Sequence, residues 1–250
     1  MRIRIFCSAV LALSMTVAGS TAVHAQAVSG QGTWETTLQA RDVGNTGTTN
    51  AFYDTALGVT WLRDANVNGQ MDWNTAMSWA SNLTVGGVGG WRLPTMADPI
   101  AVDNCTVNGT NCGFNVYPTS SEMANLFFST LGNKSYFDIS ANPQTGYGVT
   151  NAGTFQNMQS ISYWLGTEVV YQPNNAWVFM TDVGLQSATT EKSTLYASAM
   201  AVHPGDVGTV VSAVPEPETY AMLLTGLGLV GAAVRRRNSG SASRGTPCES

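Results

Sequence analysis

The sequence has few of the residues that most enzymes and nucleic-acid-binding proteins depend on. Its 250 residues include 2 histidines, and 11 lysines and arginines stand against 16 aspartates and glutamates. Binding to nucleic acid needs clustered cations that neutralise phosphates, so the acidic balance argues against a nucleic-acid partner. Only His203 lies outside the N-terminal signal expected below, and it lies where the expected domain meets its C-terminal linker, so a histidine-based triad has no clear place to form. Histidine-zinc, nucleophile-elbow and phosphate-loop motifs are missing too, and we expect a chain without catalytic activity.

Long apolar runs are also scarce, and the first of the two lies at the N-terminus. Arg2 and Arg4 precede an apolar stretch over residues 5–17, and small residues follow as far as Ala25. A charged start, an apolar middle and a small-residue end are typical of a cleaved secretion signal. We predict a signal peptide over residues 1–25, with Ala27 as the second choice of cleavage site. A membrane anchor is the weaker alternative, because the run is short for a bilayer.

The second apolar run covers residues 220–234 near the other end of the chain. A helix there would be about 24 Å long, shorter than the roughly 30 Å hydrocarbon core of a membrane. Arginines after the run would face the cytoplasm, and alone the segment reads as a weak anchor or a hydrophobic tail. The residues that flank it are Pro215, Glu216, Pro217, Arg235, Arg236 and Arg237.

This arrangement of Pro-Glu-Pro, short apolar helix and arginine cluster over residues 215–237 resembles the PEP-CTERM sorting signal. The resemblance implies a Gram-negative host and processing by an exosortase, a membrane-embedded enzyme. It also implies that one short transmembrane helix is held transiently in the inner membrane before release to the cell surface or matrix. Residues 238–250 depart from the pattern, and we expect them to form a disordered tail.

Cysteine use is consistent with export. Cys7 lies in the expected signal and Cys248 in the tail, which leaves Cys105 and Cys112 between them. Two cysteines close in sequence in an oxidising compartment favour one local disulfide. A metal site with two ligands is the weaker alternative, because it lacks further partners.

The first half of the remaining chain predicts short strands and one helix. Residues 26–50 are rich in glycine, threonine and asparagine, and we expect a flexible segment with an edge strand at 34–38. Strands are expected at 52–53 and 59–62. Asp72 is placed to cap a helix over residues 73–83, whose buried face would hold Trp73, Ala76, Met77, Ala80 and Leu83.

The second half predicts another helix and a group of late strands. Thr119 and Glu122 have the spacing of a capping box, and Gly132 follows as a helix stop. Met123, Leu126, Phe127 and Leu131 would share its buried side. Strands are expected at 162–167, 176–180 and 195–202, with Leu195, Ala197, Ala199 and Ala201 facing one way. These elements predict an α+β domain with an antiparallel sheet, two helices and long loops.

Three segments, at 58–66, 91–95 and 163–168, resemble the DUF1566 family, also called the Lcl C-terminal domain. The resemblance spans residues 51–203, followed by a linker over 204–214, and it implies a C-type-lectin-like fold. Members are commonly exposed on the cell surface, and some are adhesins. Leu165, Gly166 and His203 depart from the family pattern. The shared residues are Trp91, Arg92, Leu93, Pro94, Thr95, Tyr163, Trp164, Thr167 and Glu168, and we interpret them as structural, with Arg92 paired to Glu168.

Asp64, Asn66, Asn68 and Asp72 have the spacing of oxygen ligands in a calcium loop. The bidentate glutamate of an EF-hand is missing, because Thr75 stands at that position. A turn between a strand and a helix is the alternative explanation. Calcium is therefore a possible cofactor of this segment.

The expected function is an exported cell-surface or matrix protein that binds extracellular polysaccharide or a surface partner without catalysis. Trp164, Tyr171 and Trp177 could stack on sugar rings, although aromatic residues in strands are more often core. One alternative is a structural exopolysaccharide component without a ligand. Another is an extracellular enzyme related to formylglycine-generating enzymes, which share the lectin-like architecture and use paired cysteines.

Overall fold

The computed structural model describes residues 25–97, 105–107 and 109–211. The predicted signal peptide, apart from Ala25, lies outside these residues, as do the sorting signal at 215–237 and the tail at 238–250. Within the described ranges, no helix has the length and hydropathy of a membrane span.

A five-stranded sheet is built largely from the first part of the chain, in the order β10-β3-β2-β1-β11. The pairs β1–β2, β2–β3 and β3–β10 are antiparallel. The tight turn between β2 and β3 is held by Asp54, whose Oδ1 accepts from the backbone N–H groups of Ala56 and Leu57. The strands are β1 (Leu38–Asp42), β2 (Ala51–Asp54), β3 (Val59–Leu62), β10 (Val202–Pro204) and β11 (Thr209–Val210).

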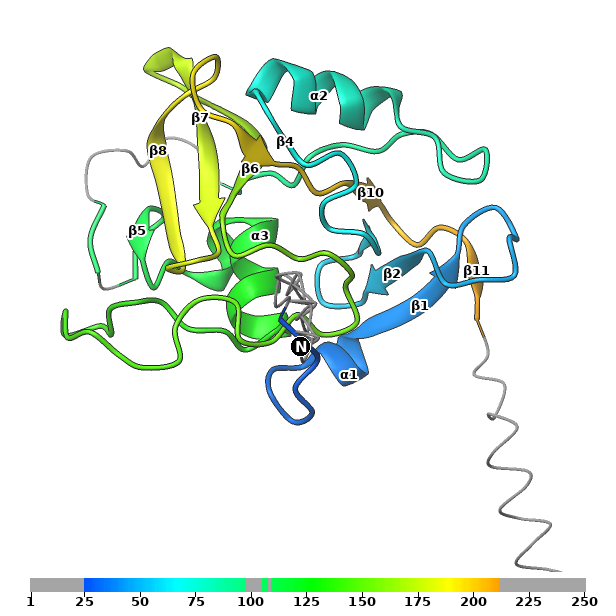
Figure 1. The fold of residues 1–250 in the computed structure, drawn as a ribbon, viewed down its shortest axis with the longest axis horizontal. Coiled ribbons are helices and arrows are strands. Elements are labelled where there is room, and N and C mark those ends of the chain that lie inside the picture. The colour runs from blue at the N-terminus through cyan, green and yellow to red at the C-terminus, as the bar shows by residue number, and fades with distance from the viewer. Residues whose placement is uncertain (1–24, 98–104, 108, 212–250) are drawn as a thin grey trace, which may run out of the picture. The chain divides into compact units, whose positions relative to one another are not determined.

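A six-stranded sheet contains the late strands, in the order β4-β9-β6-β7-β8-β5. Its pairs are antiparallel except for one parallel bridge between Tyr163 and Ser198. Figure 1 shows this sheet with α2 on one side and α3 on the other. The strands are β4 (Gln70–Met71), β5 (Gly113–Phe114), β6 (Ser162–Val169), β7 (Gln172–Met180), β8 (Leu185–Glu191) and β9 (Ala197–Ser198).

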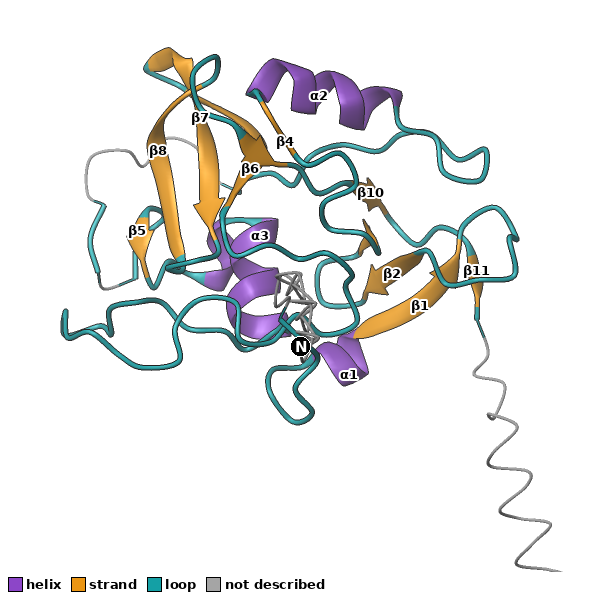
Figure 2. Cartoon of the chain, viewed as in Figure 1, coloured by secondary structure: helices purple, strands orange, loops and turns teal. Residues whose placement is uncertain are grey.

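Both faces of this sheet are buried, because neighbouring residues of a strand point to opposite sides. Tyr163 and Leu165 pack in the main core with the second helix, whereas Trp164 packs with α2 (Trp73–Asn82). The observed architecture is therefore α+β with mainly antiparallel sheets and few helices. Figure 2 shows how much of the chain is loop, including residues 131–161, which hold no helix or strand.

The first predicted helix is confirmed. Asp72 caps α2, since its carboxylate accepts from the backbone N–H of Thr75 at 3.1 Å. Trp73, Ala76 and Ala80 are buried on the inner face, and Met77 and Leu83 pack against core clusters.

The second helix exists, but its predicted cap is wrong. Thr119 lies in a short 3-10 turn, η1 (Pro118–Ser120), and Ser121 caps the helix by accepting from the N–H of Ala124. The helix begins as α3 (Glu122–Ala124) and continues as the π-helical η2 (Asn125–Thr130), and Gly132 follows with a φ of +66°. Glu122 does not take part in the cap, because its carboxylate bonds to Arg92 instead.

The predicted flexible segment at 26–50 lies within the folded unit, and the predicted edge strand at 34–38 is wrong. Residues Trp34–Thr37 form the short helix α1, and the strand begins only at Leu38. Arg41 in β1 is 3% exposed and bonds to Asp206 at 2.7 Å. Asp206 lies in the expected linker at 204–214, so the domain extends beyond both predicted boundaries.

The predicted strand at 195–202 is also wrong, because it divides between the two sheets. β9 joins the larger sheet and β10 the smaller one. Residues Ala197 to Val202 are buried without interruption, so alanines at alternate positions do not mark one face. The strand β8 was not predicted, because its small and polar residues carry no clear apolar pattern.

Candidate functional site

The shared motif at 91–95 lies between the two sheets and bonds to both. Arg92 exchanges backbone hydrogen bonds with Val202 of β10 at 2.9 and 2.8 Å. On the other side, the N–H of Gly166 in β6 donates to the carbonyl oxygen of Pro94 at 2.8 Å. The motif segments at 91–95 and 163–168, which are far apart in the sequence, are thus joined in space.

The departure at Leu165 and Gly166 has a packing explanation. Leu165 is fully buried, and its carbonyl oxygen accepts from the indole N–H of Trp73. A Cβ atom added at Gly166 would lie 3.2 Å from the Cβ of Leu93, closer than ordinary contact. Glycine therefore lets β6 approach the motif, while Thr167 still accepts from the N–H of Met96 at 3.1 Å.

Arg92 pairs with Glu122, and the predicted pair with Glu168 is wrong. Both guanidinium nitrogens, Nη1 and Nη2, lie 2.7 Å from the Glu122 carboxylate oxygens. The same carboxylate accepts from the backbone N–H of Thr95 at 2.7 Å. The hydrogen-bonded carboxylate raises the pKa of Arg92 above its ordinary value. This bidentate pair fixes the motif to the start of α3.

Glu168 contacts a different cation, because its position in β6 brings it to the α2 side of the sheet. Its carboxylate lies 2.6 Å from Nζ of Lys192, and the same Nζ lies 4.4 Å from the ring centre of Trp73. Glu168 is therefore tied to the α2 end and not to the motif arginine.

His203, one of the expected departures from the family pattern, packs against the motif tryptophan. Its ring lies 5.6 Å from that of Trp91, in an edge-to-face arrangement. Trp91 is 2% exposed and donates its indole N–H to the carbonyl oxygen of Val88. His203 thus covers one side of the hydrophobic cluster around Trp91. This ring contact does not require an arginine at position 203.

A pocket of about 400 Å³ opens beside the end of the motif. The only charged residue that lines it among the described residues is Glu122, which Arg92 neutralises. Hydroxyl and amide groups of Thr119 and Asn125 also line it, so it suits an uncharged polar group. The lining residues are Ala56, Leu57, Thr95, Met96, Ala97, Pro118, Thr119, Ser121, Glu122 and Asn125.

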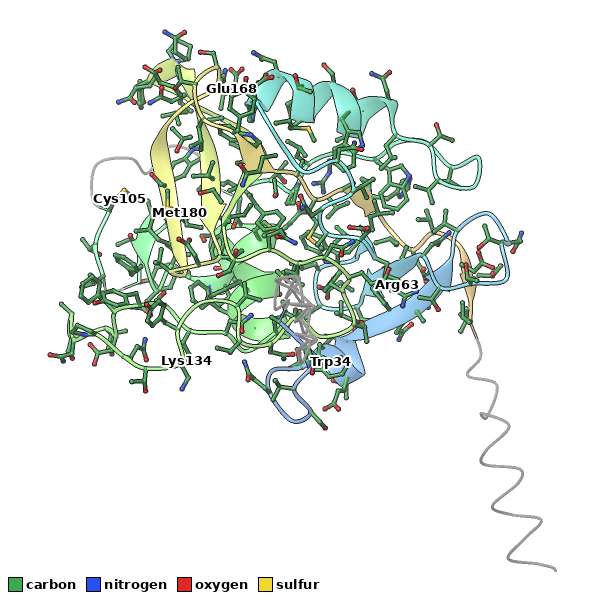
Figure 3. The ribbon with its side chains drawn as sticks, viewed as in Figure 1. Trp34, Arg63, Cys105, Lys134, Glu168 and Met180 are labelled. Atoms are coloured by element: carbon green, nitrogen blue, oxygen red, sulfur yellow. A yellow bond between two sulfur atoms is a disulfide. The ribbon has the colours of Figure 1, made fainter. Side chains whose placement is uncertain are left out.

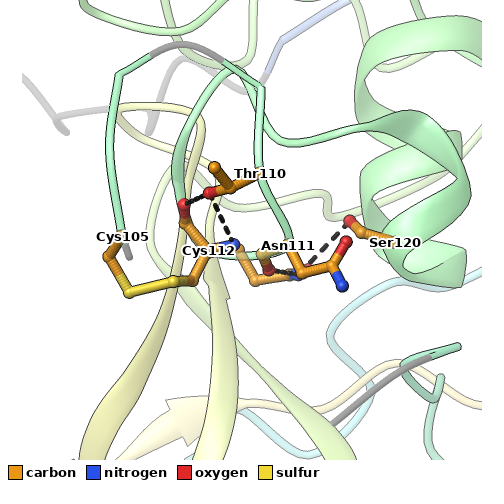
Figure 4. Close-up of a disulfide and its surroundings, with 6 residues drawn as sticks. Cys105, Thr110, Asn111, Cys112 and Ser120 are labelled. Atoms are coloured by element: carbon orange, nitrogen blue, oxygen red, sulfur yellow. Dashed lines mark hydrogen bonds between the residues drawn. A yellow bond between two sulfur atoms is a disulfide. The ribbon is translucent and has the colours of Figure 1, made fainter. Parts of the chain in front are cut away.

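A buried glutamine connects this pocket to the disulfide loop. Cys105 and Cys112 form a disulfide, shown in Figure 4 with Thr110, Asn111 and Ser120 around it. Nε2 of Gln186 donates to the carbonyl oxygen of Asn111 at 2.7 Å, and Oε1 accepts from Oγ of Ser121 at 2.6 Å. Gln186 is fully buried. Sequence reasoning missed it because its strand, β8, was not predicted.

Three of the four predicted calcium ligands, Asp64, Asn66 and Asp72, already accept hydrogen bonds from protein donors, and the fourth, Asn68, is exposed. Asp64 accepts from the backbone N–H of Asn66 and from the side chain of Asn157. Asn66 accepts from the hydroxyl of Ser198, and Asp72 caps α2. Among the described residues, no group of three or more histidines, cysteines and carboxylates is placed to hold a metal.

We expect calcium to leave the stability of this segment unchanged. Asp64→Ala should lower the free energy of unfolding by about 1 kcal/mol, because two hydrogen bonds are lost. The loss should be equal in calcium chloride and in EDTA, measured by thermal unfolding. Asp182→Ala, at an exposed aspartate, is the control and should change little. A loss of stability seen only with calcium present would restore the metal hypothesis.

The three aromatic residues considered for sugar stacking separate into two groups. Trp164 and Trp177 are fully buried in the core, so they are not available to a ligand. Tyr171 is 74% exposed in the turn between β6 and β7.

These features define a domain of mixed β-sheets with few helices and a disulfide, and residues 212–250 follow it in the sequence. Residues 50–201 match the Lcl C-terminal domain, and because this is more than half of the chain, the protein belongs to that family. Residues 213–237 match the PEP-CTERM protein-sorting motif, which implies export and exosortase-dependent, membrane-associated sorting to the cell surface. No curated protein and no solved structure matches the chain.

Proposed function

We propose that this protein is a non-catalytic component of the cell surface or extracellular matrix that binds extracellular polysaccharide. The observation that supports this most is the order of parts: a folded Lcl-type domain precedes an exosortase sorting motif in one chain. A domain delivered to the cell surface or matrix is placed where extracellular polymers are available to it. Exosortase would hold it only transiently in the inner membrane.

The charges of the domain support a neutral polymer as the ligand. Three of the five described cations, Arg41, Arg92 and Lys192, are each paired with a carboxylate, which leaves Arg63 and Lys134. Few cations therefore remain to attract an anionic polymer, and the pocket beside the motif has no unpaired charge among its described residues.

We also propose that the domain is a divergent C-type-lectin-like fold. Its helices on opposite faces of a mainly antiparallel sheet support this, as does the long loop at 131–161. A solved structure of the domain compared with lectin-like folds tests the assignment.

Binding of the purified full chain to immobilised dextran, galactomannan, alginate and chitosan tests the proposed function. We expect retention on the neutral polymers, dextran or galactomannan. Retention on none of the four would favour a structural component without a ligand. Conversion of a cysteine-containing peptide by the same preparation would favour the enzyme alternative, because formylglycine formation consumes a cysteine thiol.

A further inference from the structure

A second hollow, of about 320 Å³, lies in the long loop at 131–161, away from the family motif. Figure 3 shows Lys134 on this loop, at the end of the domain that carries β5. The loop is tied to the core by Ser135, whose buried hydroxyl donates to Gly184 and accepts from the N–H of Asn115. The hollow is therefore built on fixed backbone.

Two side-chain amides of the hollow have their oxygens available for a ligand. Nδ2 of Asn115 donates to the carbonyl oxygens of Val107 and Phe137, at 2.7 and 2.9 Å. Nε2 of Gln144 donates to those of Ser135 and Phe137, at 2.8 and 3.1 Å. An amide has two N–H donors, so both are used in each case. The oxygens accept no hydrogen bond from the described residues, and the pinned nitrogens fix their orientation.

The charges around the hollow disfavour an ionic ligand. Lys134 lines it without a carboxylate partner among the described residues, and it would repel a cation. Asp138 lines it too, and would repel an anion. Backbone N–H donation from Asn142 and Ser140 lowers the pKa of Asp138, so this carboxylate is ionised at neutral pH.

The apolar part of the hollow comes from Phe128 and Ile139. Phe128 is held by edge-to-face contacts with Phe127 and Phe179, at 4.9 and 5.8 Å between ring centres. Ile139 is 71% exposed and lines the hollow as an apolar surface open to solvent. A ligand that combines hydroxyl groups with apolar C–H faces matches these walls.

We propose that this hollow is a binding subsite for one sugar unit of a neutral polysaccharide. Hydroxyl groups of the sugar donate to the oxygens of Asn115 and Gln144 and accept from Nζ of Lys134, while a C–H face lies on Ile139. The inference rests on the proposed function. It places the polysaccharide-binding site in this hollow and not at the family motif.

Two exposed positions allow a test that leaves the fold intact. Lys134→Met removes the donor and Ile139→Ser removes the apolar contact, and neither side chain bonds to the described protein. Each should weaken binding of the full chain to dextran or galactomannan on the order of tenfold, the loss expected from one good contact. Val67→Ser is the matched control, because Val67 is an exposed apolar residue outside the hollow, and its affinity should equal that of the wild type. Thermal unfolding of all variants confirms equal folding.

The possible outcomes separate this inference from the proposed function. If the wild type binds a neutral polymer and both variants bind equally well, the subsite is wrong and the function stands. Binding only to alginate or only to chitosan overturns the subsite, since Lys134 repels a cationic polymer and Asp138 an anionic one. If the wild type binds no polymer, both proposals fail.

Discussion

Asn151→Leu should lower the free energy of unfolding by about 4 kcal/mol, one of the two largest effects that we expect for this protein. Asn151 is fully buried, and its Oδ1 accepts from the backbone N–H groups of Val28 and Gly153, both at 2.9 Å. Its Nδ2 donates to the carbonyl oxygens of Gln31 and Leu131, at 3.0 and 2.8 Å. Leucine removes the Asn151 hydrogen bond from four backbone groups, of which the carbonyl oxygen of Leu131 still accepts from Nε2 of Gln31 at 3.3 Å. Each buried group that is left without a partner costs about 1–3 kcal/mol. Chemical denaturation measures the change.

The same substitution should release the N-terminal segment, because Val28 and Gln31 belong to it. Limited proteolysis should therefore cut residues 26–33 faster in Asn151→Leu than in the wild type. Asn74→Leu is the matched control, since Asn74 is exposed on α2, and its effect should stay within about 0.5 kcal/mol. A loss below about 1 kcal/mol for Asn151→Leu, with unchanged cleavage, would mean that this segment is not part of the folded unit.

This network explains why the N-terminal boundary could not be predicted. Glycine, threonine and asparagine between residues 26 and 50 are typical of loops, and a loop composition carries no sign of its tertiary partners. The contacts of Val28 and Gln31 lie 123 and 120 positions away along the chain, at Asn151. By contrast, α2 was predictable, because its cap residue Asp72 and its periodic apolar residues are local signals that lie within the helix itself or next to it in the sequence.

The pairing within the candidate site could not be predicted from the sequence. The motif residues around Arg92 were singled out, whereas the partner Glu122 was assigned to a helix cap. Serine and threonine at three successive positions, Thr119 to Ser121, each offer a capping oxygen, and only the fold selects Ser121. Once Ser121 caps the helix, Glu122 stands at its first turn and faces the motif arginine.

Arg92→Leu should lower the free energy of unfolding by about 3 kcal/mol. The change removes two charge-assisted hydrogen bonds and leaves the Glu122 carboxylate, 15% exposed, without its cation. Loss of one partner of an ion pair costs about 3–5 kcal/mol when both partners are buried. The expected cost is lower here because Arg92 is partly exposed. Adding Glu122→Gln should recover part of the loss, because the stranded charge disappears while the N–H of Thr95 keeps an acceptor.

Arg63→Leu provides the matched control for this prediction. Arg63 is also partly exposed, but its side chain has no described carboxylate partner and, among the described residues, donates only to the carbonyl oxygen of Thr49. Its loss should cost less than about 1 kcal/mol. Denaturant midpoints of the variants, compared with polymer binding, decide between two roles for Arg92. Reduced stability shows that the arginine anchors the motif to α3, whereas an unchanged midpoint with lost binding would show that it contacts the ligand.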